Sequence, residues 1–263
     1  MELGQALDVQ AGEQVAFVGA GGKTAAAWRV LRELTAAGHA TILTTTTHIL
    51  EPADLPLLLE SNPDAAQIRA ALTQAPAIVL AAGREEGEHP EAAARSFAPV
   101  RPVKLVGLAP GRIDGLALLP GVTWLIEADG ARGHELKAPA EYEPVIPPSA
   151  DRVIVVAGLH AIGRPLDDQV VHRPERAAHL LGVPPGTVIT GGHIARLLVH
   201  PAGGLKGVPD GAALVALLTQ REATPPHPDA PSIAERLLAG ERFTRVVLAA
   251  LRAAEPVLEV WSS

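Results

Sequence analysis

Residues 15–24 constrain the fold of this chain more than any other stretch, because an apolar run leads directly into a glycine cluster. The cluster ends in Lys23 and Thr24, and an alanine-rich stretch with helical spacing follows it. This order is typical of a buried strand, a phosphate-binding loop and a helix. Glycine permits the tight turns that point several amides at one anion, and the helix adds unpaired N–H groups and the positive end of its dipole. We therefore predict that the phosphates of a nucleotide are bound by Gly19, Ala20, Gly21, Gly22, Lys23, Thr24 and Ala25.

The glycine loop is shorter than the standard Walker A motif, because Phe17 stands where that motif has its first glycine. The form found here, G-x-x-G-K-T starting at Gly19, is similar to the loop of Mur-type ligases; deviant Walker NTPases add a signature lysine, where this chain has Val18. A dinucleotide fingerprint is disfavoured, since Thr24 replaces its third glycine and no acid ends the second predicted strand. We expect ATP or another nucleoside triphosphate, with Lys23 at the β- and γ-phosphates. A plain glycine turn before a helix is the alternative.

Apolar stretches of strand length alternate with helical stretches along the 263 residues, of which 48% are hydrophobic. This alternation indicates a three-layer α/β fold with a mostly parallel sheet. We expect one α/β domain over residues 1–263, in which residues 1–150 form a P-loop-NTPase-like, nucleotide-binding half and residues 151–263 complete the sheet and the site. In the second half we predict strands at 151–157, 245–248 and 257–261, and helices at 192–199, 211–219 and 232–239.

A second chemical feature is the predicted strand at residues 122–126, which leads into Glu127 and Asp129. Apolar residues followed by acids resemble a Walker B strand, whose carboxylate holds Mg²⁺ beside the phosphate loop. We predict Lys23, Glu127 and Asp129 as catalytic residues, and Thr24, Glu127 and Asp129 as metal ligands. Only one carboxylate is expected to reach the metal, because Glu127 and Asp129 face opposite ways if the chain is still extended. The alternative is a turn that happens to carry two acids.

Polar residues after two of the predicted strands are candidates for a second substrate. Thr46, Thr47 and His48 follow the second strand, at the edge of an α/β sheet where ligands bind. Arg132 and Lys137 follow the acidic strand end in a charged segment rich in proline and glycine, and could neutralise phosphates or a substrate carboxylate. The alternatives are a β-prone strand end for the threonines and solvated surface charges for Arg132 and Lys137.

Composition excludes several classes of function. The net charge of −7 and the lack of a basic run interleaved with aromatic residues argue against binding to nucleic acid or to an anionic membrane. The absence of cysteine excludes disulfides, thiolate metal sites and cysteine nucleophiles. The N-terminal residues show no signal pattern, and no run reaches the roughly 18 apolar residues of a membrane span. We expect a soluble, cytoplasmic protein.

Seven short segments form an ordered set, at residues 19–24, 44–48, 127–131, 137–139, 143–147, 172–175 and 205–207. Together they resemble the YqeC family, accessory proteins of selenium-dependent molybdenum hydroxylases that are also called selenium cofactor biosynthesis proteins. The similarity extends from about residue 12 to the C-terminus. His172 and Arg173, which begin one of these segments and precede a predicted helix, join the candidate substrate-binding residues.

The resemblance implies a role in making or inserting a selenium-bearing molybdenum cofactor, with a molybdopterin cofactor and a molybdenum hydroxylase as expected partners. Since the chain has no cysteine, thiols cannot handle selenide here, and a nucleotide-dependent step is easier to accommodate. We expect a Mg²⁺-dependent NTPase or ligase-like enzyme. The alternative is a binder or carrier of a nucleotide-bearing molybdopterin cofactor that hydrolyses nothing.

Overall fold

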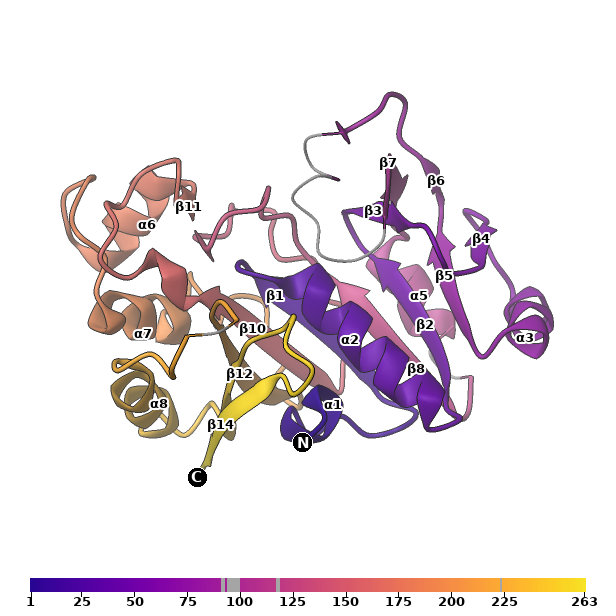
Figure 1. Ribbon diagram of the computed structural model, residues 1–263. Coiled ribbons are helices and arrows are strands. Elements are labelled where there is room, and N and C mark those ends of the chain that lie inside the picture. The colour runs from indigo at the N-terminus through magenta and orange to yellow at the C-terminus, as the bar shows by residue number, and fades with distance from the viewer. Residues whose placement is uncertain (91–92, 94–99, 117–118, 223) are drawn as a thin grey trace.

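The computed structural model describes residues 1–90, 93, 100–116, 119–222 and 224–263, and a large β-sheet lies at its centre (Figure 1). Within these residues the sheet has nine strands, in the order β14-β13-β12-β10-β1-β8-β2-β5-β4. Neighbouring strands are parallel except for β13 and β14. In chain order the strands are β1 (Gln14–Gly19), β2 (Ala40–Thr45), β4 (Leu57–Leu59), β5 (Ala77–Ala81), β8 (Val122–Glu127), β10 (Arg152–Gly158), β12 (Ala213–Thr219), β13 (Arg245–Ala249) and β14 (Val257–Ser262).

Helices cover both faces of this sheet, which gives three layers (Figure 1). Helices α1 and α2 pack on one face; α6, α7 and α8 pack on the other face over the later strands, and α3 and α5 on that same face over the earlier strands. The predicted three-layer α/β fold with a mostly parallel sheet is therefore confirmed. The helices are α1 (Leu3–Ala6), α2 (Lys23–Ala36), α3 (Ala65–Gln74), α5 (Pro110–Leu116), α6 (Pro174–Leu181), α7 (Gly191–Val199) and α8 (Ala230–Leu238), with the short 3₁₀ helix η1 (Leu159–Ala161).

Strand β1 shows how the apolar run in the sequence builds the centre of the fold. Val15 and Phe17 pack toward α2, whereas Ala16 and Val18 pack toward the helices on the other face. A strand covered on both faces needs apolar residues at every position rather than at alternate ones. Because β10 and β8 flank β1, the glycine loop that follows β1 lies at the centre of the sheet's carboxyl edge.

Two smaller sheets lie beside this edge. Strands β3 (His48–Pro52), β7 (Val100–Val106) and β6 (Gly83–Arg84) form an antiparallel sheet that continues from the end of β2. Strands β9 (Leu136–Lys137) and β11 (Val171–His172) form a short parallel pair. The second pair brings the segment after β8 next to the start of α6, which matters for the site described below.

The predicted helix at 211–219 is wrong, because Ala213–Thr219 is strand β12 at the inside of the sheet. Its residues are almost all buried, with β10 on one side and β13 on the other. A short run that is apolar at every position fits a buried strand and a buried helix equally well, so periodicity could not separate them. Among the described residues, no helix combines the length and hydrophobicity that crossing a membrane requires.

Candidate functional site

The glycine loop turns tightly against β10 at the end of β1. Gly19 and Gly21 have φ angles of +93° and +84°, which side-chain-bearing residues rarely adopt. A Cβ atom on Gly19 would lie 2.3 Å from the carbonyl oxygen of Val156, and one on Gly21 would lie 2.4 Å from the amide nitrogen of Gly158. Both positions therefore require glycine, for backbone conformation and for close approach to β10.

The amides of the loop divide into two groups. The first three donate hydrogen bonds within the protein: Gly19 to Asp129 Oδ2 at 3.0 Å, Ala20 to the Val156 carbonyl at 2.9 Å and Gly21 to the His134 carbonyl at 2.9 Å. Among the described residues, the next four amides, those of residues 22–25, have no hydrogen-bond acceptor, and no side chain caps α2. The unpaired donors therefore belong to the first turn of α2, where the helix dipole also favours an anion.

The ammonium group of Lys23 is directed into the protein. Lys23 is 4% exposed, and its Nζ atom lies 3.0 Å from Asp129 Oδ1, 3.9 Å from Glu127 Oε1 and 2.7 Å from the Gly19 carbonyl oxygen. Burial by itself would lower the pKa of Lys23, but the charges of Asp129 and Glu127 outweigh it and raise the pKa above its usual value. Lys23 is therefore charged and held by carboxylates in this conformation.

The carboxylates of Glu127 and Asp129 approach this ammonium group, and the hydroxyl of Thr24 bonds to one of them. The Thr24 hydroxyl donates to Glu127 Oε2 at 2.7 Å, and both carboxylates are almost fully buried. Burial raises the pKa of Glu127, and the charge of Lys23 opposes that rise. Glu127 and Asp129 both approach Lys23. The condition for their facing opposite ways, an extended chain, is not met, because β8 ends at Glu127.

These three residues fit a magnesium ion by their chemistry. Hydroxyl and carboxylate oxygens are the ligands that Mg²⁺ prefers, and Mg²⁺ commonly takes only one or two carboxylates, together with phosphates and water. The described residues contain no cluster of three or more acids or histidines arranged to hold a metal.

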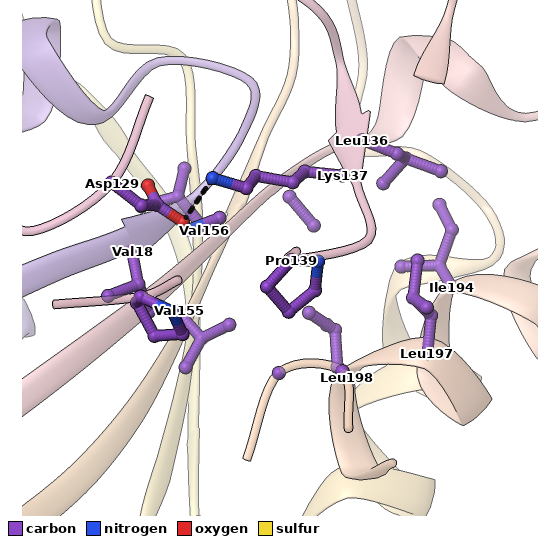
Figure 2. A pocket seen from close by; sticks show the side chains of 15 residues that line it. Val18, Asp129, Leu136, Lys137, Pro139, Val155, Val156, Ile194, Leu197 and Leu198 are labelled. Atoms are coloured by element: carbon purple, nitrogen blue, oxygen red, sulfur yellow. Dashed lines mark hydrogen bonds and ion pairs between the residues drawn. The ribbon is translucent and has the colours of Figure 1, made fainter. Parts of the chain in front are cut away.

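A series of alternating charges, here called the ion-pair chain, extends from the glycine loop to the start of α6. Lys137 Nζ lies 2.9 Å from Asp129 Oδ2, a contact visible in Figure 2, and 2.7 Å from Glu143 Oε2. Arg173 donates to the same Glu143 oxygen at 2.8 Å. The Lys137 side chain is 0% exposed, so it is neither the solvated charge nor, in this conformation, a direct contact for a substrate.

The sequence-predicted substrate residues fall into different places. Thr46 lies beside the acids, since its amide donates to the Glu127 carbonyl oxygen at 3.2 Å. The amide of Thr47 donates to the hydroxyl of Thr45. His48 is exposed and begins β3 in the small antiparallel sheet. Arg132 is exposed in the loop after β8, with a φ angle of +50°. The same loop contains His134, whose carbonyl oxygen accepts a hydrogen bond from the Gly21 amide. The backbone of Arg132 is therefore near the glycine loop.

His172 lies next to the ion-pair chain, because β11 pairs it with Lys137. Its ring stacks on that of His134 with 5.5 Å between centroids. Burial, followed by the charges of Arg173 and Lys137, lowers the pKa of His172 to about 4. The ring is therefore neutral near pH 7.

Sequence reasoning missed Glu143 and His134 as parts of this site. Glu143 is 8% exposed and joins Lys137 to Arg173, and burial alone would raise its pKa, yet hydrogen bonds from Arg173 and Lys137 lower it to about 2. The signal that could have identified Glu143 is the charged, proline-rich segment after β8. Glu143 stands beside Pro144 in that segment, and a plain surface turn does not require an acid there.

A small cavity adjoins the ion-pair chain on the face of the sheet opposite α2. Its volume is about 30 Å³, enough for roughly two water molecules. Apolar side chains of β1, β10 and α7 line it, and Asp129 and Lys137 close one end, as Figure 2 shows. A cavity of this volume does not hold a nucleotide.

Comparison with known proteins places this arrangement in a family. The model of the YqeC protein family matches residues 15–175. The chain belongs to the YqeC family. A relative from Escherichia coli strain K12, described as "Uncharacterized protein YqeC", is 34% identical over 203 residues, which cover 76% of this chain and 73% of the relative. The resemblance drawn from the ordered motifs is therefore confirmed.

The part of the chain that matches the YqeC family contains the whole candidate site. It begins at the second residue of β1 and ends two residues after Arg173, so both the glycine loop and the ion-pair chain lie inside it. The later strands β12, β13 and β14, which complete the sheet, lie outside it.

Proposed function

We propose that this YqeC family member is a Mg²⁺-dependent nucleoside triphosphatase, with ATP as the expected nucleotide. The observation that carries the proposal is the first turn of α2, where unpaired amides lie beside Lys23, Thr24 and two buried carboxylates. A helix start with free N–H groups is a ready site for a phosphate. The amides of residues 22–25 would hold the phosphates, and Gly19, Ala20 and Gly21 would shape the loop.

Lys23 would have to exchange partners for this function. A nucleotide brings negative phosphates and Mg²⁺, so Lys23 can leave Asp129 for a phosphate while the carboxylates turn to the cation. Removing an ion from a buried partner is costly when it leaves that partner unpaired. Here Lys137 stays 2.9 Å from Asp129, so Asp129 keeps a counter-ion after Lys23 leaves.

Thr24, Glu127 and Asp129 would hold Mg²⁺, which when bound neutralises charge on the transferring phosphoryl group. The exposed Arg132 would add positive charge near the same phosphates. The protein's contribution would be mainly positioning and electrostatics, as is usual for phosphoryl transfer.

We also propose that this activity serves the maturation of a selenium-dependent molybdenum hydroxylase. The support is the resemblance of the ordered motifs to a family described in those terms. The absence of cysteine favours an energy-supplying or phosphate-transfer step over direct handling of selenide.

Calorimetric titration with ATP and GTP, each with and without Mg²⁺, followed by phosphate-release assays, tests the proposal. Thr24→Val and Lys23→Ala should each weaken binding of the Mg²⁺ complex and abolish turnover. Lys104→Ala, a change in the outlying strand β7, is the matched control and should leave both unchanged. If the wild type binds the nucleotide but releases no phosphate, the carrier alternative replaces the triphosphatase proposal. If the folded wild type binds no nucleotide, both hypotheses are refuted.

A further inference from the structure

The ion-pair chain ends near the protein surface in a group of side chains that the proposed function does not use. This group, here called the basic cluster, consists of Arg173, Arg176 and Lys206 together with the aromatic ring of Tyr142. Arg173 directly precedes α6, Arg176 lies within α6, and Lys206 belongs to the glycine-rich turn after α7.

Arg173 joins the ion-pair chain to the surface. One of its terminal nitrogens donates to Glu143, and the other lies 3.5 Å from the Tyr142 hydroxyl. The guanidinium carbon is 5.9 Å from the centre of the Tyr142 ring, and Tyr142 is 74% exposed. Arg173 also has a φ angle of +67°, a strained conformation for arginine that persists only when the surroundings enforce it. The protein therefore holds a cation and an open aromatic face together at this place.

Arg176 supplies a donor that the protein itself leaves unused. It lies three residues after Arg173, the N-cap residue of α6, and the charges of both arginines act on Lys206. Its Nε atom is buried and has no hydrogen-bond acceptor among the described residues. Buried donors are almost always paired, so an acceptor that reached this atom after the Arg176 side chain turned outward would recover the free energy that the unpaired donor costs.

Lys206 brings a third cation to the same place. Its Nζ atom donates to the carbonyl oxygens of Ala140 and of Glu141, the latter at 2.8 Å, so it holds the segment that carries Tyr142. Burial and then the charge of Arg176 lower the pKa of Lys206, and the charges of Glu141 and Glu143 oppose this shift. The acids that act on Lys206 are Glu141, whose side chain is exposed, and Glu143, which Lys137 and Arg173 already share; Glu175 also stands between the two arginines, in the first turn of α6.

We propose that the basic cluster binds an anionic group, a phosphate or a carboxylate, of the second substrate that the phosphate-loop site acts on. The inference rests on the proposed function in so far as the ligand is a substrate of the nucleotide site. Anion binding by the basic cluster does not itself require nucleotide turnover. The cluster adjoins the nucleotide site through the ion-pair chain, along the same carboxyl edge of the sheet. An aromatic face beside the cations suits a ligand whose anionic group is attached to a planar or apolar body.

Titration of the full-length protein with inorganic phosphate and, separately, with citrate tests the inference by NMR of arginine Nε–H groups. We expect the Nε–H signals of Arg173 and Arg176 to move with at least one probe. Arg176→Met and Lys206→Met should each weaken that response about tenfold, the usual effect of losing one charge-assisted hydrogen bond. Arg69→Met, on the outlying helix α3, is the matched control and should leave the response unchanged.

The two sites report through different signals, so their failures are separable. Phosphate at the helix start moves the backbone amides of residues 22–25, whereas phosphate at the basic cluster moves the arginine side chains. If the arginine signals stay fixed in both titrations, or if Arg176→Met and Lys206→Met respond like the wild type, the inference is overturned. Movement of the amides alone would support the nucleotide site and refute the basic cluster as an anion site.

Discussion

Replacing Lys137 by methionine tests whether the ion-pair chain is the structural centre of the site. Lys137 is fully buried between Asp129 at 2.9 Å and Glu143 at 2.7 Å, and methionine fills similar space without the charge. Removing one partner of a buried ion pair typically costs about 3–5 kcal/mol, since it leaves a buried charge uncompensated. We expect the lower end, about 3 kcal/mol, because Asp129 keeps Lys23 and Glu143 keeps Arg173.

Urea unfolding of the wild type and of Lys137→Met measures this cost directly. The double variant Lys137→Met with Glu143→Gln should be less destabilised than the sum of the two single variants, because the two changes remove one interaction in common, and a double-mutant cycle detects this difference. Lys104→Met breaks a partly exposed pair with Glu85 at 3.6 Å and should cost at most about 1 kcal/mol. If Lys137→Met is as stable as Lys104→Met, the reasoning about the ion-pair chain is refuted.

Three further predictions concern backbone geometry and pH. Gly19→Ala should lower the free energy of unfolding several times more than Gly38→Ala. Both glycines have positive φ angles, but only at Gly19 would an added Cβ atom meet a backbone oxygen, at 2.3 Å. Equal losses of stability in denaturant unfolding would contradict this. The pKa of Glu143 is lowered to about 2, so its stabilising contribution is present above its ordinary pKa near 4.5 and is lost as the pH falls toward 2. Over that pH range the free energy of unfolding should therefore fall less for Glu143→Gln than for the wild type. The pKa of His172 is lowered from 6.5 to about 4, so stability should fall as the pH drops between those values, and thermal unfolding of His172→Gln should lack that part of the decline.

Much of the fold could be predicted because its strongest signals are local. The apolar run of β1, the glycines and the start of α2 stand next to one another in the chain, and each requires only its neighbours to be recognised. The strand that ends at Glu127 is equally local. Strand β12 was misassigned because its identity depends on residues far away in the sequence, namely β10 and β13, which pair with its two edges, and the helices that bury its two faces.

The partners of the charged residues could not be predicted in the same way. Lys23 was expected at the phosphates, but Asp129, more than 100 residues later in the chain, holds it in this conformation. Lys137 offered an even choice between a substrate contact and a solvated charge; it is not solvated, because β9 buries it between two acids in this conformation. His48 lies in another sheet, since the chain enters β3 directly after the threonines. Burial and pairing with residues far away in the sequence decide these outcomes, and the spacing of residues along the chain predicts neither.

The most direct test of the account is a titration of the ¹⁵N-labelled protein with Mg²⁺–ATP, followed through the backbone amide signals of residues 19–25. The account predicts large shifts for residues 22–25, whose amides are free to bind phosphate, and smaller ones for Gly19, Ala20 and Gly21, whose amides already have acceptors. Unchanged signals for residues 22–25 at nucleotide concentrations well above those in cells would contradict the claim that the start of α2 is a phosphate site.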